Sequence, residues 1–193
     1  MTSSFRQAVR LVAALNLGYF GIELGVATII GSVSLFADSV DFLEDASVNI
    51  LILAALNWNA RNRARLGMAL AGILLLPGVA ALWTAWQKFL QLAPPAAVPL
   101  SLTGAGALAV NLCCALILAR YRPYSGSLTH AAFLSARNDI LANIAIIAAG
   151  LLTAATRSPW PDLFVGLGIV LLNAGAAREV FRAAIKEHPE AQT

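Results

Sequence analysis

Six stretches of the chain are apolar over the length that a helix needs to cross a lipid bilayer. A spanning helix takes about 20 predominantly apolar residues. Backbone groups cannot stay unpaired in hydrocarbon and the alternating pattern of membrane β-strands is absent, so we expect each stretch to be helical. The sequence therefore predicts an all-α integral membrane protein, a six-transmembrane-helix bundle. Its spans lie at about 9–31, 34–57, 66–88, 97–119, 128–154 and 161–182, within one unit of residues 1–187.

The composition agrees with a membrane protein. Only 12% of the 193 residues are charged, whereas a soluble domain carries about a quarter. The mean hydropathy is +0.75. Asn16 and Glu23 interrupt the first apolar run, which favours a retained span over a cleaved signal peptide. The formal net charge of +3 gives no sign of a nucleic-acid partner, and we expect none.

The basic residues fall mainly on one side of the predicted membrane. Only Lys88 and Arg157 fall on the other side, and Arg137 lies inside the fifth span. The positive-inside rule therefore places both termini, including a short tail at 188–193, in the cytoplasm. We expect the membrane to be a bacterial inner membrane. The basic residues on the cytoplasmic side are Arg6, Arg10, Arg61, Arg63, Arg65, Arg120, Arg122, Arg178, Arg182 and Lys186.

Ionisable side chains inside the spans are the candidates for function, since each costs on the order of 3 kcal/mol near a helix centre. Asp41 and Asp45 are four residues apart on the second span, and Ser135 and Asp139 have the same spacing on the fifth, so each pair shares a helix face. Two such faces, turned toward each other, would form a cage of oxygen atoms. The other ionisable residues within spans are Glu23, Asp38, Glu44 and Arg137, while Asp162 and Glu179 lie near the ends of the sixth span and call for no special role.

Three segments resemble the cation diffusion facilitator family of divalent metal efflux transporters. NLGYFGIELG…GSVSLFADSVDFLEDA, residues 16–46, resembles its first two spans; THAAFLSARNDILANIAIIAAGLL, residues 129–152, its fifth; and residues 160–187 its sixth. The resemblance implies a metal site formed by Asp41, Asp45, Asp139 and Ser135. Ser135 departs from the usual His or Asp, and a hydroxyl is a weak zinc ligand that binds directly or through water.

The resemblance implies a divalent cation transporter of the zinc type, not an enzyme and without a cofactor. Carboxylates must lose protons to bind metal, so proton-coupled antiport that exports metal from the cytoplasm is the expected mechanism. Zinc is the expected cargo, and the three-carboxylate set leaves manganese, iron, cadmium and cobalt open. The candidates for a proton or metal relay are Asp38, Glu44, Glu23, Asn138 and Asn143.

Besides Ser135, a second departure from the family pattern and one unexplained residue leave alternatives open. The family's C-terminal cytoplasmic domain is not expected here, so a homodimer would be held by the transmembrane helices. Arg137 points roughly opposite to Asp139 on the helix, and its role is not defined by the sequence. One alternative is a transport-inactive relative that acts as a partner or scaffold. Another is an intramembrane aspartyl enzyme using Asp41 and Asp139, although the Gly-x-Gly-Asp context of such enzymes is absent.

Overall fold

The computed structural model describes residues 3–55, 79, 81–121 and 127–172, with their side chains except those of residues 3, 55 and 127–137. Most of the expected third span, the last part of the sixth, the basic segment 56–65 and the tail therefore lie outside the described residues. So do the side chains of Ser135 and Arg137.

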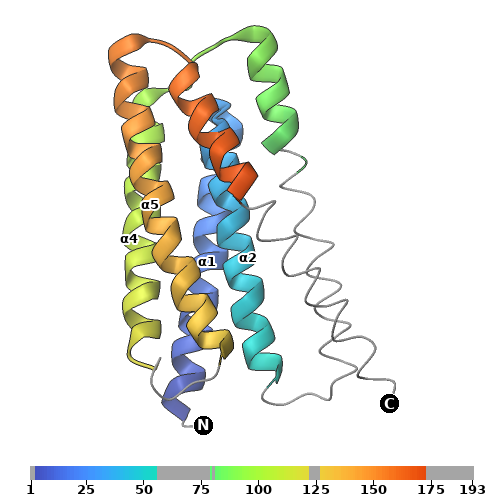
Figure 1. Ribbon diagram of the computed structural model, residues 1–193, viewed down its shortest axis with the longest axis vertical. Helices are drawn as coiled ribbons and strands as arrows, with labels where there is room; N and C mark the ends of the chain where they lie inside the picture. The colour runs from blue at the N-terminus through green and yellow to red at the C-terminus, as the bar shows by residue number, and fades with distance from the viewer. Residues whose placement is uncertain (1–2, 56–78, 80, 122–126, 173–193) are drawn as a thin grey trace.

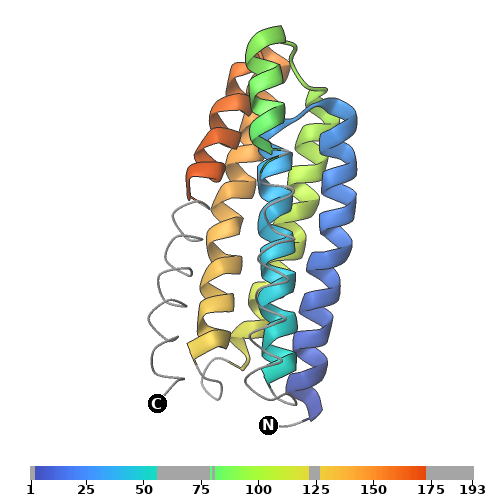
Figure 2. The same ribbon diagram turned by 90° about the vertical axis from the view of Figure 1, so that its right-hand side faces the viewer.

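The described residues form helices joined by short turns, and they include no β-strand. Four long helices, α1 (Ser3–Ile30), α2 (Val33–Ala55), α4 (Ala97–Ala119) and α5 (Ser127–Thr156), run along the long axis of the molecule (Figures 1 and 2). Two shorter helices cover residues 81–91 and Trp160–Leu172. Within the described part of the chain, three segments are long and apolar enough to cross a membrane: Ser4–Ile30, Ala97–Ala119 and Asn138–Thr156. The predicted all-α membrane bundle is confirmed.

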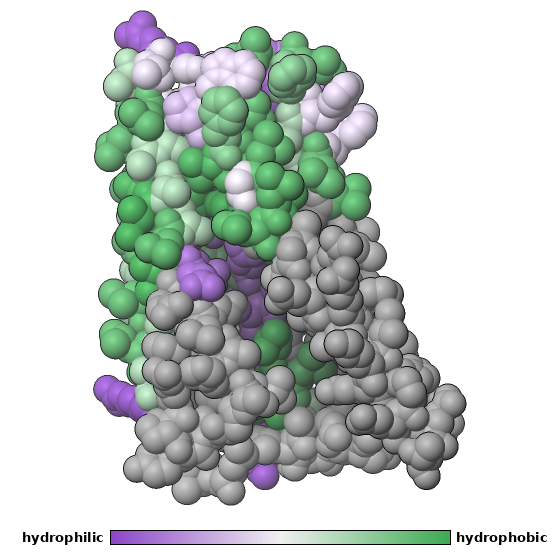
Figure 3. Space-filling model, viewed as in Figure 1, coloured by the Kyte–Doolittle hydropathy of each residue, from purple (hydrophilic) through white to green (hydrophobic). Residues whose placement is uncertain are grey.

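Two apolar clusters hold the helices together at the two ends of the bundle. Near the start of α1, Phe5 and Val9 pack with Ile52 of α2 and Leu118 of α4. At the other end, residues of α1, α2, α4 and α5 meet Ile169 of the last helix. The outward side chains are also largely apolar (Figure 3). A bundle that is hydrophobic on its outer surface suits a lipid environment, where apolar side chains face the hydrocarbon.

The turn between α1 and α2 corrects one expectation from the sequence. Gly31 adopts a φ of +63°, a left-handed conformation that glycine takes without a side-chain clash, and it ends α1. Asp162, which was expected to need no special role near the start of the sixth span, is completely buried against this turn. It accepts hydrogen bonds from Ser32, Val33 and Ser34. The reason is that α2 starts here, and its unpaired backbone N–H groups need an acceptor.

Candidate metal site

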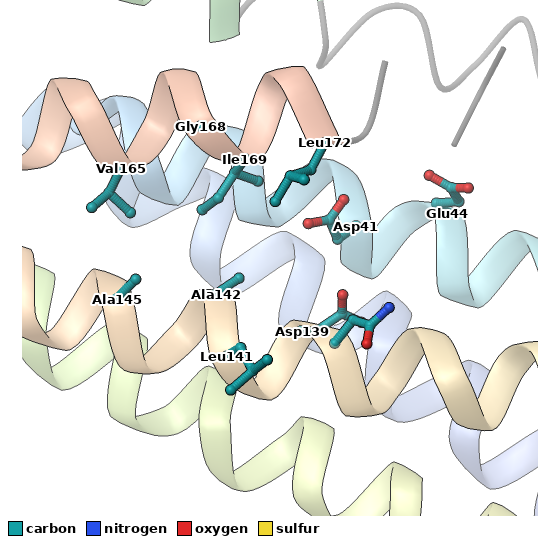
Figure 4. Close-up of a pocket in the computed structure, with 11 residues that line it drawn as sticks. Asp41, Glu44, Asp139, Leu141, Ala142, Ala145, Val165, Gly168, Ile169 and Leu172 are labelled. Atoms are coloured by element: carbon teal, nitrogen blue, oxygen red, sulfur yellow. The ribbon is translucent and has the colours of Figure 1, made fainter. Parts of the chain in front are cut away.

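A cavity of about 610 Å³ lies between α2, α5 and the helix Trp160–Leu172 (Figure 4). On the face shown in Figure 3, hydrophilic residues are visible about halfway along the molecule, directly below a largely hydrophobic region. Polar side chains of α2 and α5 form one part of the wall, and apolar side chains form the rest. The lining residues are Asp41, Glu44, Asn138, Asp139, Leu141, Ala142, Ala145, Val165, Gly168, Ile169 and Leu172.

Asp41 and Asp139 bring carboxylates from two different helices to this cavity. Both project toward the space between α2 and α5, whereas Glu44, one turn further along α2, points away from the pair (Figure 4). Asp41 and Asp139 are each partly accessible, and their charges lie close enough to interact. Two carboxylates whose charges interact repel each other unless a proton or a cation lies between them. The pair therefore has the chemistry of a cation site.

Asp45 stands one turn beyond Asp41 and is only 5% exposed. It does not line the cavity, but its charge interacts with those of Asp41 and Asp139. Among the described residues, no three His, Cys, Asp or Glu side chains converge closely enough to hold a metal ion. The three carboxylates are thus neighbours on two helices and do not form a closed coordination shell. The side chain of Ser135, the fourth expected ligand, lies outside the described part of the chain.

Behind the cavity, Asp38 belongs to a separate buried group of polar side chains. Asn143 of α5 donates from Nδ2 to both of its carboxylate oxygens, at 3.0 and 2.8 Å. Asn111 of α4 donates to Asn143 Oδ1 at 3.3 Å, which links α4 to α5. All three side chains are at most 2% exposed. Asn143 therefore serves Asp38 and is not a lining residue of the cavity.

Glu23 extends this buried group to α1. It is completely buried and approaches Asp38 closely enough for a hydrogen bond when one of the two carboxyls carries a proton. One turn away, Tyr19 donates its hydroxyl to the carbonyl of Thr103 at 2.6 Å. The relay candidates thus separate by position, since Glu44 and Asn138 line the cavity while Glu23, Asp38 and Asn143 lie behind it.

Two features of this region were missed in the sequence. One face of the helix Trp160–Leu172 lines the cavity with Val165, Ile169 and Leu172. These residues follow each other at steps of four and three, the spacing that places side chains on one helix face. Lys88 and Asp162 form a buried ion pair at 3.2 Å. The sequence contains a clue to this pair. Lys88 ends the predicted third span and Asp162 begins the sixth, so both fall on the same side of the predicted membrane.

Ionisable side chains within membrane-spanning helices mark candidate ion or substrate pathways, and here carboxylates of two helices face one cavity. The model of the cation efflux transmembrane domain matches residues 9–187, and the chain belongs to the cation efflux family, the cation diffusion facilitators. It is an integral membrane protein that transports divalent cations, and the family is one of transporters, not enzymes. The alternative of an intramembrane aspartyl enzyme is set aside. No curated protein matches the chain.

Proposed function

We propose that the protein exports a divalent cation of the zinc type in exchange for protons. Asp41, Asp45 and Asp139 bind the cation, and Ser135 contributes weakly or through a water molecule. The observation that carries this proposal is that Asp41 of α2 and Asp139 of α5 line the same cavity. Carboxylates from two separate helices allow a single ion to draw those helices together and, when it leaves, to release them.

The proton coupling follows from competition for the same oxygen atoms. A carboxylate must be deprotonated to bind metal, so binding of a cation expels protons and protonation releases the cation. Glu23, Asp38 and Asn143 connect α1, α2 and α5 through a buried polar group behind the cavity. We assign the proton relay to this group, and the metal relay to Glu44 and Asn138 at the cavity. Alternating access of the helices then gives antiport.

The proposal includes the setting of the transporter. The distribution of basic residues supports cytoplasmic termini in a bacterial inner membrane, so the exported cation leaves the cytoplasm. The exposed apolar surfaces of α1, α4 and α5 offer area for both lipid and a second copy, and we propose a homodimer held by transmembrane helices.

The test is exchange across the membrane of reconstituted vesicles. The purified chain is placed in vesicles that contain a metal-sensitive dye and a pH-sensitive dye, and zinc, manganese, iron(II), cadmium and cobalt are added one at a time. We expect zinc entry with proton exit. Asp139→Asn should lower exchange by more than about tenfold, because it removes a charged ligand. Leu141→Ala, which alters an apolar residue of the same cavity, should leave the rate within about twofold. Undiminished exchange by Asp139→Asn would remove Asp139 from the site.

The same preparation tests the alternative of a transport-inactive partner or scaffold. This alternative is favoured by serine at position 135 and by the lack of a closed three-ligand cluster among the described residues. A titration of the purified protein with each metal separates the two functions. A transporter binds at least one of these ions and loses affinity in Asp45→Asn. An inactive relative binds none above background, and Asp45→Asn changes nothing.

A further inference from the structure

A second group of buried charged and hydroxyl side chains lies at the end of the bundle where α1 turns into α2. Asp162 Oδ1 accepts hydrogen bonds from the hydroxyls of Ser32 and Ser34, both at 2.6 Å, and from the Ser34 backbone N–H at 3.2 Å. Its Oδ2 accepts from the Val33 N–H at 2.9 Å. A carboxylate from the last helix therefore caps the first turn of α2, where the helix dipole favours negative charge.

Lys88 joins a third helical segment to this group. Its Nζ lies 3.2 Å from Asp162 Oδ2, and it also donates to the carbonyl of Gly31 at the end of α1. The cation thus stands at the C-terminus of one helix and the anion at the N-terminus of the next, and the helix dipoles favour both positions. The side chains of Lys88 and Asp162 are 5% and 0% exposed. We call Ser32, Ser34, Lys88 and Asp162 the clamp.

Tight packing surrounds the clamp. A Cβ atom added to Gly166 would lie 2.6 Å from Val33 Cγ1 and 2.7 Å from the Ser34 nitrogen, so the last helix lies with its backbone against the first turn of α2. Val33, Ala85 and Leu163 form a buried apolar cluster at the same place. Between α2 and the last helix, this end of the bundle is closed.

The clamp and the cavity are connected by the same two helices. On α2, Ser34, Asp38 and Asp41 follow each other at steps of four and three residues, and therefore share a face. On the last helix, Asp162, Val165 and Ile169 do the same. A rise of about 1.5 Å per residue places the clamp about 10 Å from the cavity carboxylate Asp41. Separation of the two helices at the clamp would open the cavity toward this end.

The other boundary of this end is a groove between α5 and the last helix. It is lined mainly by apolar side chains, among them Ala148, Leu152 and Phe164, the last two of which are well exposed on the outer surface. A hydrated divalent cation does not cross such an apolar surface. Of the two sides of the helix Trp160–Leu172, the one next to α2 is therefore the polar one, and the clamp lies there.

We infer that the Lys88–Asp162 clamp is the gate that closes the cation cavity toward the face bearing the α1–α2 turn. The inference rests on the proposed transport function, and it adds the residues whose separation gives a bound cation access to that face. Lys88 and Asp162 are positioning residues, since neither lines the cavity. The gate holds because four hydrogen bonds from Ser32, Val33 and Ser34 and one from Lys88 reach Asp162 only while the helix Trp160–Leu172 lies against the start of α2.

The test measures from which face the cavity can be reached. A reporter cysteine replaces Ala142 of the cavity wall in a Cys113→Ala, Cys114→Ala background, and a membrane-impermeant maleimide is added to one face of sealed vesicles. The face near the clamp is identified by labelling of Ser158→Cys. In the otherwise unchanged chain, we expect labelling of residue 142 from that face to be at least about tenfold slower than from the opposite face. Asp162→Asn and Lys88→Met should raise labelling from the clamp face by about ten- to a hundredfold, the effect of losing a charged hydrogen-bond partner from the closed state.

Two controls separate gating from general loosening. Lys88→Arg keeps the cation and should stay close to the unchanged chain. Thr153→Val alters a buried hydroxyl at the same end of α5 that has no hydrogen-bond partner among the described residues, and it should not change labelling. Labelling that stays low in both Asp162→Asn and Lys88→Met would overturn the gate, as would an equal rise in Thr153→Val.

The labelling of residue 142 in the protein with Lys88 and Asp162 unchanged also tests the gate, and it does not depend on whether the variants at these two positions fold. Equal labelling of residue 142 from both faces in the reporter background would overturn closure at the clamp. The labelling also requires no metal flux. A chain that fails in the exchange assay but shows the expected labelling contradicts the proposed transport and leaves the gate in place. A chain that exchanges metal with labelling unaffected by the clamp variants contradicts the gate alone.

Discussion

Asp38 and Asp41 are three residues apart on α2, and their surroundings give them different chemistry. Asp38 is completely buried and receives two hydrogen bonds from Asn143, so both of its oxygens already have a partner within the protein. Asp41 is partly accessible and faces the cavity together with Asp139. Of these two acids, Asp41 is therefore the one that a solute in the cavity can reach. The spacing of the acids in the sequence could not separate these roles, because burial and partners come from α5 and not from α2 itself.

The Asn143 side chain is predicted to stabilise the fold through Asp38. Asn143→Ala leaves a buried carboxylate without its donor, and the cost is about 1–3 kcal/mol or more for a charged group. We expect the free energy of unfolding, measured by SDS titration in mixed micelles, to fall by that amount. Ile144→Ala changes the neighbouring residue, which is 50% exposed, and should have a much smaller effect. A wild-type unfolding midpoint in Asn143→Ala would show that the hydrogen bond to Asp38 contributes little.

At the scale of the helices, the apolar pattern along the chain predicted where the helices lie. It did not predict which helices pack against each other. Apolar length predicted the helical spans, and α4, at Ala97–Ala119, covers the same residues as the expected fourth span. The spacing of Asp41 on α2 and Asp139 on α5 predicted two polar faces, and the structure brings both residues to one cavity. Two features were not predicted: the cavity wall formed by the helix Trp160–Leu172, and the Lys88–Asp162 ion pair. They depend on which helix packs beside α2, and hydrophobic periodicity does not encode neighbours.

Two glycines of the last helix allow the contact with α2 to be tested. Gly166 lies against the Ser34 backbone, so Gly166→Ala forces the helices apart and should destabilise the protein by about 1–3 kcal/mol, the usual cost of overpacking. Gly168→Ala is the matched control, since an added Cβ there meets no atom within 4 Å. It should be neutral or stabilising by up to about 1 kcal/mol through helix propensity. Unfolding in SDS measures both, and equal effects would argue against close packing at Gly166.

At the scale of the whole molecule, polar groups are arranged in layers along the bundle axis inside an apolar surface. The clamp lies where α1 turns into α2, and the carboxylates of α2 and α5 lie nearer the middle. Arg6 and Arg10 belong to the first turns of α1, which begins at the opposite end of the bundle (Figure 1). Charges inside lipid persist only when they are paired or functional, because each is costly in hydrocarbon. Asp162 is paired with Lys88, and in the proposed function the cavity carboxylates bind the cargo. Along the bundle axis, basic residues therefore come first, the cavity carboxylates follow, and the clamp lies at the far end.

This order predicts the orientation of the protein in the membrane. The basic residues Arg6, Arg10 and Arg120 lie at one end of the helices and Arg157 at the other, and positive charge favours the cytoplasmic side. We therefore expect an impermeant maleimide to label Ser158→Cys on intact bacterial cells, in a background lacking Cys113 and Cys114. Arg120→Cys should be labelled only after the cells are made permeable. The clamp would then face outward, and its opening would release the cation from the cell. If Arg120→Cys is labelled on intact cells and Ser158→Cys is not, the predicted orientation is wrong and the clamp faces the cytoplasm.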